Sequence, residues 1–167
     1  MPGQKTRERA RTDAREGKAA STQAGEFVHE EIEHIREGKH GARSAKQAIA
    51  IGLSKARRAG VKVPPPQKAK TRGTTRAKAA SDYARGRKFA GRTPSPKRSR
   101  AITSALQRES TQAASRSALS RQARASAQSR GAANRSRAAQ QAVRTKGKIG
   151  LRNAARKAAR KRIKQKS

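Results

Sequence analysis

Positive charge is distributed very unevenly along this chain, and this limits how the chain can fold. Residues 1–37 hold eight of the ten acidic residues against seven Lys and Arg, so this part is near neutral. Residues 38–167 hold 37 Lys and Arg and only Asp82 and Glu109, a net charge of +35. Like charges at this density repel one another and become compact only against a polyanion. We therefore expect a small neutral part followed by a long basic part.

Large apolar side chains are too few for an extensive core. Ile, Leu, Val and Phe together number 17 of the 167 residues, and most of the remaining hydrophobic residues are Ala. A highly charged chain with less than about 20% of these large residues is expected to be mostly disordered alone. Without Cys, the chain offers no disulfide, zinc–thiolate site or thiol nucleophile. We also expect no secretory leader and no membrane span, because no apolar run approaches about 20 residues.

Composition divides the chain into four predicted stretches. The fold class that we expect is mostly α-helical and disordered, with one small helix-turn-helix-like pair and a tail that becomes helical on binding. The predicted stretches are a flexible arm over 1–24, the helical pair over 25–63, a Pro/Gly linker over 64–96, and a basic Ala/Arg/Ser-rich tail, helical or disordered, over 97–167.

The helical pair is predicted from apolar spacing. The two helices are expected over residues 26–37 and 44–59. In the first, Ile32 and Ile35 recur at helical spacing, and Gly38 ends the run. The apolar face is narrow, so this helix buries little and needs a neighbour or a ligand for stability.

The second helix of the pair has clear signals at both ends. Ser44 is the expected N-cap, and Gln47 stands at the capping-box spacing from it. Ile49 and Leu53 belong to the apolar stripe that follows. Gly60 supplies the left-handed residue that ends the helix.

Three clusters of basic residues are the candidate phosphate-binding groups. The Ser95-Pro96-Lys97-Arg98 pattern is typical of linker-histone tails, in which a turn lays two cations along an A·T-rich minor groove; it is equally a helix start. In the tail, Arg152, Arg156 and Arg160 repeat every four residues, so phosphates alongside would relieve their repulsion. The full candidate set is Arg85, Arg87, Lys88, Lys97, Arg98, Arg100, Arg152, Arg156, Lys157, Arg160, Lys161 and Arg162.

Metal binding and catalysis have little support in the sequence. The run HEEIEH at residues 29–34 resembles the H-E-x-x-H motif of zinc proteases, but His29 and His34 lie five residues apart, about 140° around a helix. Glu26, Glu30 and His34 do line up, and an exposed acidic face explains them more simply. No G-x-S-x-G turn or phosphate loop is present. We therefore expect no metal site, no cofactor and no enzyme activity.

One segment is also familiar as a sequence. The run KQAIAIGLSKARRAG at residues 46–60 closely resembles the core of a family of small basic bacterial proteins of unknown function, loosely described as DNA-binding or histone-like. The likeness extends to residues 95–100 and 119–123 and covers roughly 20–165. It implies a bacterial cytoplasmic setting, which favours the nucleoid, and it implies little about activity.

These features together predict a histone-like, nucleoid-associated protein that binds DNA without sequence specificity by neutralising phosphates. We favour DNA over RNA as the partner. One alternative is an RNA-associated or ribosome-associated basic protein. The other is a protein-interaction or regulatory module, in which helices 26–37 and 44–59 dock on a protein partner. A membrane partner is not expected, because an apolar face made mostly of Ala inserts poorly.

Overall fold

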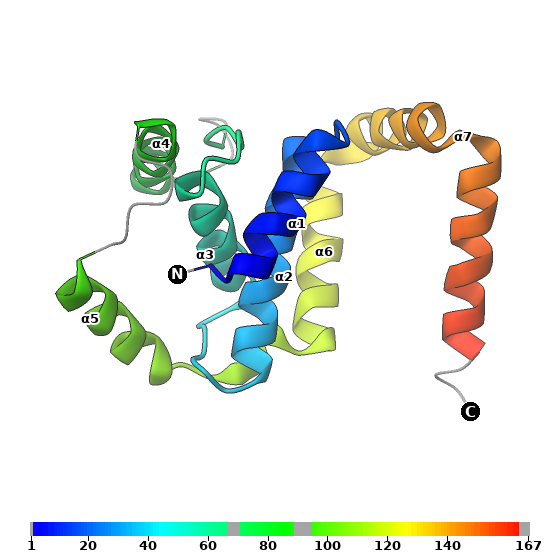
Figure 1. Cartoon of the computed structure of the whole chain (residues 1–167). Helices are drawn as coiled ribbons and strands as arrows, with labels where there is room; N and C mark the ends of the chain where they lie inside the picture. The colour runs from blue at the N-terminus through cyan, green and yellow to red at the C-terminus, as the bar shows by residue number, and fades with distance from the viewer. Residues whose placement is uncertain (1, 67–70, 89–94, 164–167) are drawn as a thin grey trace. The chain divides into compact units, whose positions relative to one another are not determined.

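The structure is a computed structural model that describes residues 2–66, 71–88 and 95–163, with side chains at all but ten of them. Within these ranges the chain forms seven α-helices and one short 3-10 helix and no strand, so the prediction of a mostly α-helical fold is confirmed (Figure 1). Its contacts divide it into a first unit, residues 1–122, and a second unit, residues 123–167. None of the described helices is both long and apolar enough to cross a membrane.

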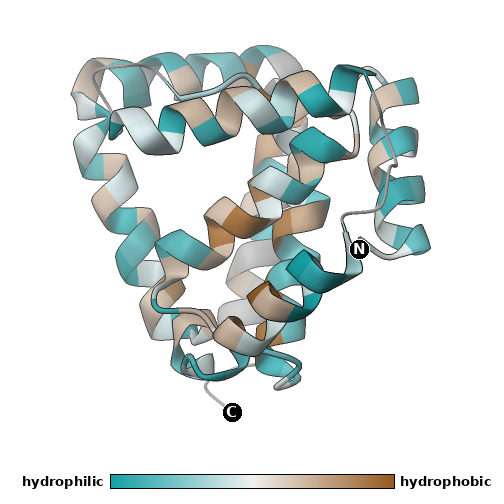
Figure 2. Cartoon of the chain, turned by 90° about the vertical axis from the view of Figure 1, so that its left-hand side faces the viewer, coloured by the Kyte–Doolittle hydropathy of each residue, from teal (hydrophilic) through white to brown (hydrophobic). Residues whose placement is uncertain are grey.

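Three helices form the centre of the first unit. Helix α2 (Ala20–Arg36) packs against both α1 (Gln4–Arg15) and α3 (Ala45–Arg58). The largest fully buried side chains, Phe27, Glu31 and Ile35, all belong to α2, and most of the remaining core is Ala. Figure 2 accordingly shows few strongly hydrophobic segments. In chain order the helices are α1 (Gln4–Arg15), α2 (Ala20–Arg36), α3 (Ala45–Arg58), α4 (Gly73–Lys88), α5 (Pro96–Gln107), η2 (Thr111–Ala114), α6 (Arg116–Ser129) and α7 (Gly131–Ile163).

The predicted helical pair corresponds to α2 and α3, with α2 beginning earlier than expected. Gly38 and Gly60 end the two helices with φ angles of 73° and 94°, as their positions predicted. At the start of α3, Ser44 Oγ accepts a hydrogen bond from the Gln47 backbone N–H at 3.2 Å. The Gln47 side chain reaches one residue further back than in a capping box, and accepts from the Arg43 N–H at 2.8 Å.

The expectation of a flexible arm over residues 1–24 is wrong. Helix α1 forms there and packs against α2, which itself begins inside this stretch. Thr6, Ala10 and Asp13 are buried, and their spacing of four and three residues places them on one helix face. This face holds no Leu, Ile, Val or Phe, so hydrophobic periodicity gave no signal for the helix.

The expectation of an unstructured linker over residues 64–96 is also wrong for the part that the structure describes. Helix α4 occupies most of that part and packs against α3. Its buried residues, Ala79 and Gly86, are small and seven residues apart, so they line one face at two turns' distance. Residues 67–70 and 89–94 of the predicted linker lie outside the described residues.

Small and polar groups hold α4 against α3. A Cβ added at Gly86 would lie 1.8 Å from the carbonyl oxygen of Arg57, so only Gly allows this approach. Asp82 accepts a hydrogen bond from Ser54 Oγ at 2.6 Å and lies 3.7 Å from the guanidinium of Arg58. These polar contacts replace the apolar contacts that the sequence lacks.

The predicted tail over residues 97–167 does not behave as one segment. Its first part belongs to the first unit, because η2 packs against both α2 and α3. Ala113 and Ala114 of η2 are buried in a cluster with Ile35 and Ala48. Apolar spacing in the sequence does not predict these contacts, because they again use Ala rather than large apolar side chains.

The second unit, residues 123–167, contains the end of α6 and the whole of α7. Gly131 separates the two helices with a φ angle of 72°. A second break occurs at Gly147, where non-helical backbone angles interrupt α7. Val143 and Ile149 are 45% and 75% exposed, so even the large apolar residues here lack a core.

Candidate nucleic-acid interface

Exposed cations without an acidic partner predominate in α4 to α7. Between Arg76 and Arg156, the 18 Lys and Arg residues with described side chains are all exposed. None of them forms an ion pair with another described residue. The two acids in this stretch, Asp82 and Glu109, face cations that come from earlier in the chain, Arg58 and Arg43.

The candidate residues Arg85, Arg87 and Lys88 lie together in the last turn of α4, and all three are exposed. Cations are favourable at a helix C-terminus, because the partial negative charge of the helix dipole lies there. Gly86, buried against α3, fixes this turn to the first unit. The cluster is therefore held on a folded support.

The candidate residues Lys97, Arg98 and Arg100 lie in the first turns of α5. Ser95 is the N-cap residue and Pro96 begins the helix, so this motif is a helix start, one of its two predicted roles. The first turn contains no acidic residue. Three exposed cations therefore stand at the positive end of a helix dipole, and a bound anion would relieve that repulsion.

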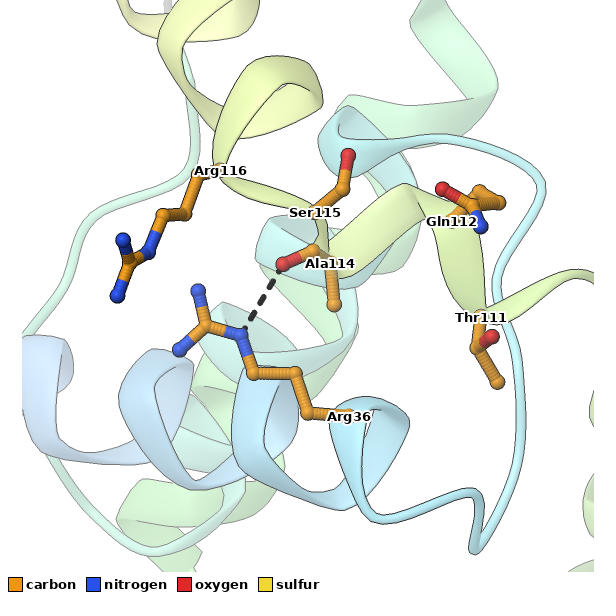
Figure 3. Close-up of a pocket in the computed structure, with 6 residues that line it drawn as sticks. All are labelled: Arg36, Thr111, Gln112, Ala114, Ser115 and Arg116. Carbon is orange, nitrogen blue, oxygen red and sulfur yellow. Dashed lines mark hydrogen bonds between the residues drawn. The ribbon is translucent and has the colours of Figure 1, made fainter.

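A basic hollow that the sequence analysis missed lies between the end of α2 and the start of α6 (Figure 3). It is open to solvent and has a volume of about 410 Å³. Figure 3 shows the guanidinium groups of Arg36 and Arg116 on the same side of it. Arg36 Nε donates to the Ala114 carbonyl oxygen at 3.1 Å, and Ser115 Oγ accepts from the Ala118 N–H in the first turn of α6.

This hollow suits a phosphate group by its charge and position. The first N–H groups of a helix attract anions, and α6 begins beside Arg36 and Arg116. Arg36 also pairs with Glu33 at 2.8 Å, which offsets part of its charge. No local pattern could have predicted the site, because Arg36 and its partner Ala114 are 78 residues apart in sequence.

In α7, Arg152 and Arg156 are exposed and lie one helical turn apart, as the four-residue spacing predicted. The other four tail candidates belong to the same helix by their backbone. Their side chains lie outside the described residues; they are Lys157, Arg160, Lys161 and Arg162.

The residues predicted to carry structure or a protein contact are largely used within the first unit. Ile35 is fully buried, and Ile32 packs against its cluster. Leu53 packs against the second cluster, which contains Phe27, and Ile49 is half-buried. The stripe that the protein-interaction alternative uses as a docking surface therefore contributes to the interior. Ser44 and Gln47 cap the start of α3, and Gly60 ends it.

Residues 15–68, which include α2 and α3, match a family of unknown function (DUF6496). No curated protein and no solved structure matches the chain.

Proposed function

We propose that this chain binds duplex DNA without reading its sequence, by neutralising phosphates with the cations of α4 to α7. The observation that supports this most strongly is that no cation with a described side chain beyond Arg58 has an acidic partner. The eight ion pairs that Lys and Arg form among the described residues all take their cation from Arg58 or earlier in the chain. Beyond Arg58, cations without counter-charges accumulate, and a polyanion supplies what the protein lacks.

The dimensions of the basic helices fit this function. Duplex DNA carries one negative charge per ~1.7 Å, so a net charge of +34 matches on the order of 60 Å of duplex. Helix α7 alone has 33 residues, and the break at Gly147 gives it two straight parts. Arg152 and Arg156 lie one turn apart on it, a spacing that suits contacts with successive phosphates and not with base edges.

The aromatic residues argue for duplex over single strands. Single-strand and many RNA binders stack bases on exposed aromatic rings. Of the three aromatics, Phe27 is buried, Tyr83 is half-buried and Phe89 lies outside the described residues. We therefore propose a histone-like role at the bacterial nucleoid, with an RNA-associated role as the alternative that a competition experiment separates.

The test compares two variants that lose the same charge at different places. Both are expected to stay folded, because the six side chains are exposed and form no ion pair among the described residues. The α5 variant replaces Lys97, Arg98 and Arg100 with Gln, and the α1 control replaces Lys5, Arg11 and Arg15 with Gln.

Affinity for a mixed-sequence duplex is measured by fluorescence anisotropy at several salt concentrations. The slope of log affinity against log salt should become shallower by up to about 2.7 in the α5 variant. Each phosphate contact contributes about 0.9 to this slope, and three cations are removed. The α1 control should retain the wild-type slope. Equal losses in both variants would show that only total charge matters. In a competition experiment, duplex RNA of the same sequence is added at equal concentration. Displacement of the DNA by this RNA would favour the RNA alternative.

A further inference from the structure

A buried carboxylate in the first unit has an oxygen without a partner. Glu31 of α2 is 0% exposed. Its Oε2 is paired with the ammonium group of Lys55 on α3. Its Oε1 is buried and accepts no hydrogen bond from the described residues. Buried polar atoms are nearly always satisfied, so an open carboxylate oxygen indicates a missing ligand.

Two histidines lie beside this oxygen. His34 follows Glu31 by almost one turn of α2, and His40 lies in the loop after the Gly38 turn. One ligand atom from each of the three residues lies within 4.8 Å of the other two. The closest is His40 Nε2, 3.4 Å from Glu31 Oε1.

The hydrogen bonding of His40 places a lone pair towards Glu31. His40 Nδ1 lies 3.1 Å from the carbonyl oxygen of Gly41, which can only accept, so Nδ1 carries the proton. In neutral imidazole Nε2 then holds a lone pair, and it faces the lone pairs of Glu31 Oε1. Two acceptors at this distance repel each other unless a proton or a metal cation lies between them. A ring N–H donated to a backbone carbonyl is also the usual outer contact of a metal-ligating histidine.

Local electrostatics keep the other imidazole in its ligand form. Burial, followed by the charge of Lys55, lowers the pKa of His34, so the neutral ring dominates near pH 7. Lys55 itself repels a dication, which makes the affinity weaker than that of a site without this charge. The surrounding charge favours binding of a cation, because residues 1–37 hold eight of the ten acidic residues.

We propose that Glu31, His34 and His40 form a binding site for a divalent transition-metal ion of the zinc class. Two imidazoles and one carboxylate are donors that Zn²⁺ accepts, with water as a fourth ligand. Donors around tetrahedral zinc lie about 3.3 Å apart for bonds of 2.0–2.1 Å. Small rotations of the side chains therefore bring the donor atoms from their present separation into coordination.

Such an ion would join α2 to the loop that follows it. The loop containing His40 continues through Gly41 and Ala42. The Gly41 N–H donates to the Leu106 carbonyl oxygen at 2.9 Å, and the Ala42 N–H donates to the Ser110 carbonyl oxygen at 3.0 Å. The metal would thus fix α2 to the loop that supports η2. Structural metals commonly take this role in small domains with limited cores.

The experiment uses the full chain after removal of metals with a chelator. Co²⁺ is titrated into wild type, His34→Gln, His40→Gln and the matched control His29→Gln, whose side chain is exposed on the same helix. Wild type and the control should bind one Co²⁺ with visible ligand-field bands of a nitrogen–oxygen site. Zn²⁺ at about 100-fold above its Kd should raise their Tm by about 5 °C or more.

Each variant is compared with its own metal-free Tm, so a general loss of stability is distinguished from a loss of binding. We expect the bands and the Zn²⁺-dependent rise in Tm to disappear in His34→Gln and His40→Gln. Absence of 1:1 Co²⁺ binding in wild type would overturn the site. Equal binding by all four proteins would overturn it as well.

Discussion

The close contact between α2 and α3 predicts opposite effects for two similar substitutions. In Gly52→Ala, the new Cβ would lie 2.7 Å from Val28 Cα and 3.0 Å from the Phe27 carbonyl oxygen. Both atoms are backbone, so the helices must move apart. Overpacking of this kind costs about 1–3 kcal/mol, and the better helix propensity of Ala returns about 1 kcal/mol. We expect a net loss of up to about 2 kcal/mol in the free energy of unfolding.

The matched control is Gly25→Ala in α2. Gly25 is exposed, and an added Cβ would meet nothing within 4 Å. This variant should gain about 0.5–1 kcal/mol from helix propensity alone. The Tm measured by circular dichroism should therefore fall for Gly52→Ala and rise for Gly25→Ala, by about 4 °C for each kcal/mol. If both variants gain stability equally, α2 and α3 do not approach as closely as described.

Three further predictions concern the first unit and the basic helices. Ser44→Ala should lower the free energy of unfolding by about 1 kcal/mol in urea denaturation, because it removes the cap of α3; Ser44→Asp, which can still accept that bond, should not. Ile49→Asp combined with Leu53→Asp should unfold α2 and α3, as seen by circular dichroism, yet leave most of the affinity for DNA; loss of that affinity in an anisotropy titration would show that the helical pair, and not the basic helices, is the functional site. Helix content in residues 123–167 should rise when duplex is added to this fragment, because phosphates relieve the repulsion between its cations; an unchanged circular dichroism spectrum at saturation would contradict this.

Local signals in the sequence predicted part of the fold correctly. Gly38, Ser44 and Gly60 indicated the ends of α2 and α3, because turns and caps depend on a few neighbouring residues. Pro96 likewise marked the start of α5. These signals act within about one helical turn, so they are readable without tertiary structure.

The contacts that hold the first unit together could not be predicted in the same way. Ala10 in α1, Gly86 in α4 and Ala113 in η2 are all buried, yet none contributes to a pattern of large apolar side chains. Their role comes from close backbone approach, which depends on partners distant in sequence. An apolar count therefore underestimated how much of this Ala-rich chain folds.

The candidate sites show the same division. The basic clusters could be named as candidate phosphate-binding groups from the sequence, since charge does not depend on packing. The pairing of Arg36 with the start of α6 and the meeting of Glu31 with His40 both depend on the turn after α2. The H-E-x-x-H comparison examined His29, which is exposed, and overlooked His40, which follows the turn.

The salt dependence of DNA binding tests the central claim most directly. Affinity of the full chain for a mixed-sequence duplex is measured between about 50 mM and 200 mM salt. If roughly ten of the 18 exposed cations contact phosphates, log affinity falls linearly with log salt with a slope of about −9. A slope near zero over this range would contradict phosphate neutralisation as the mechanism.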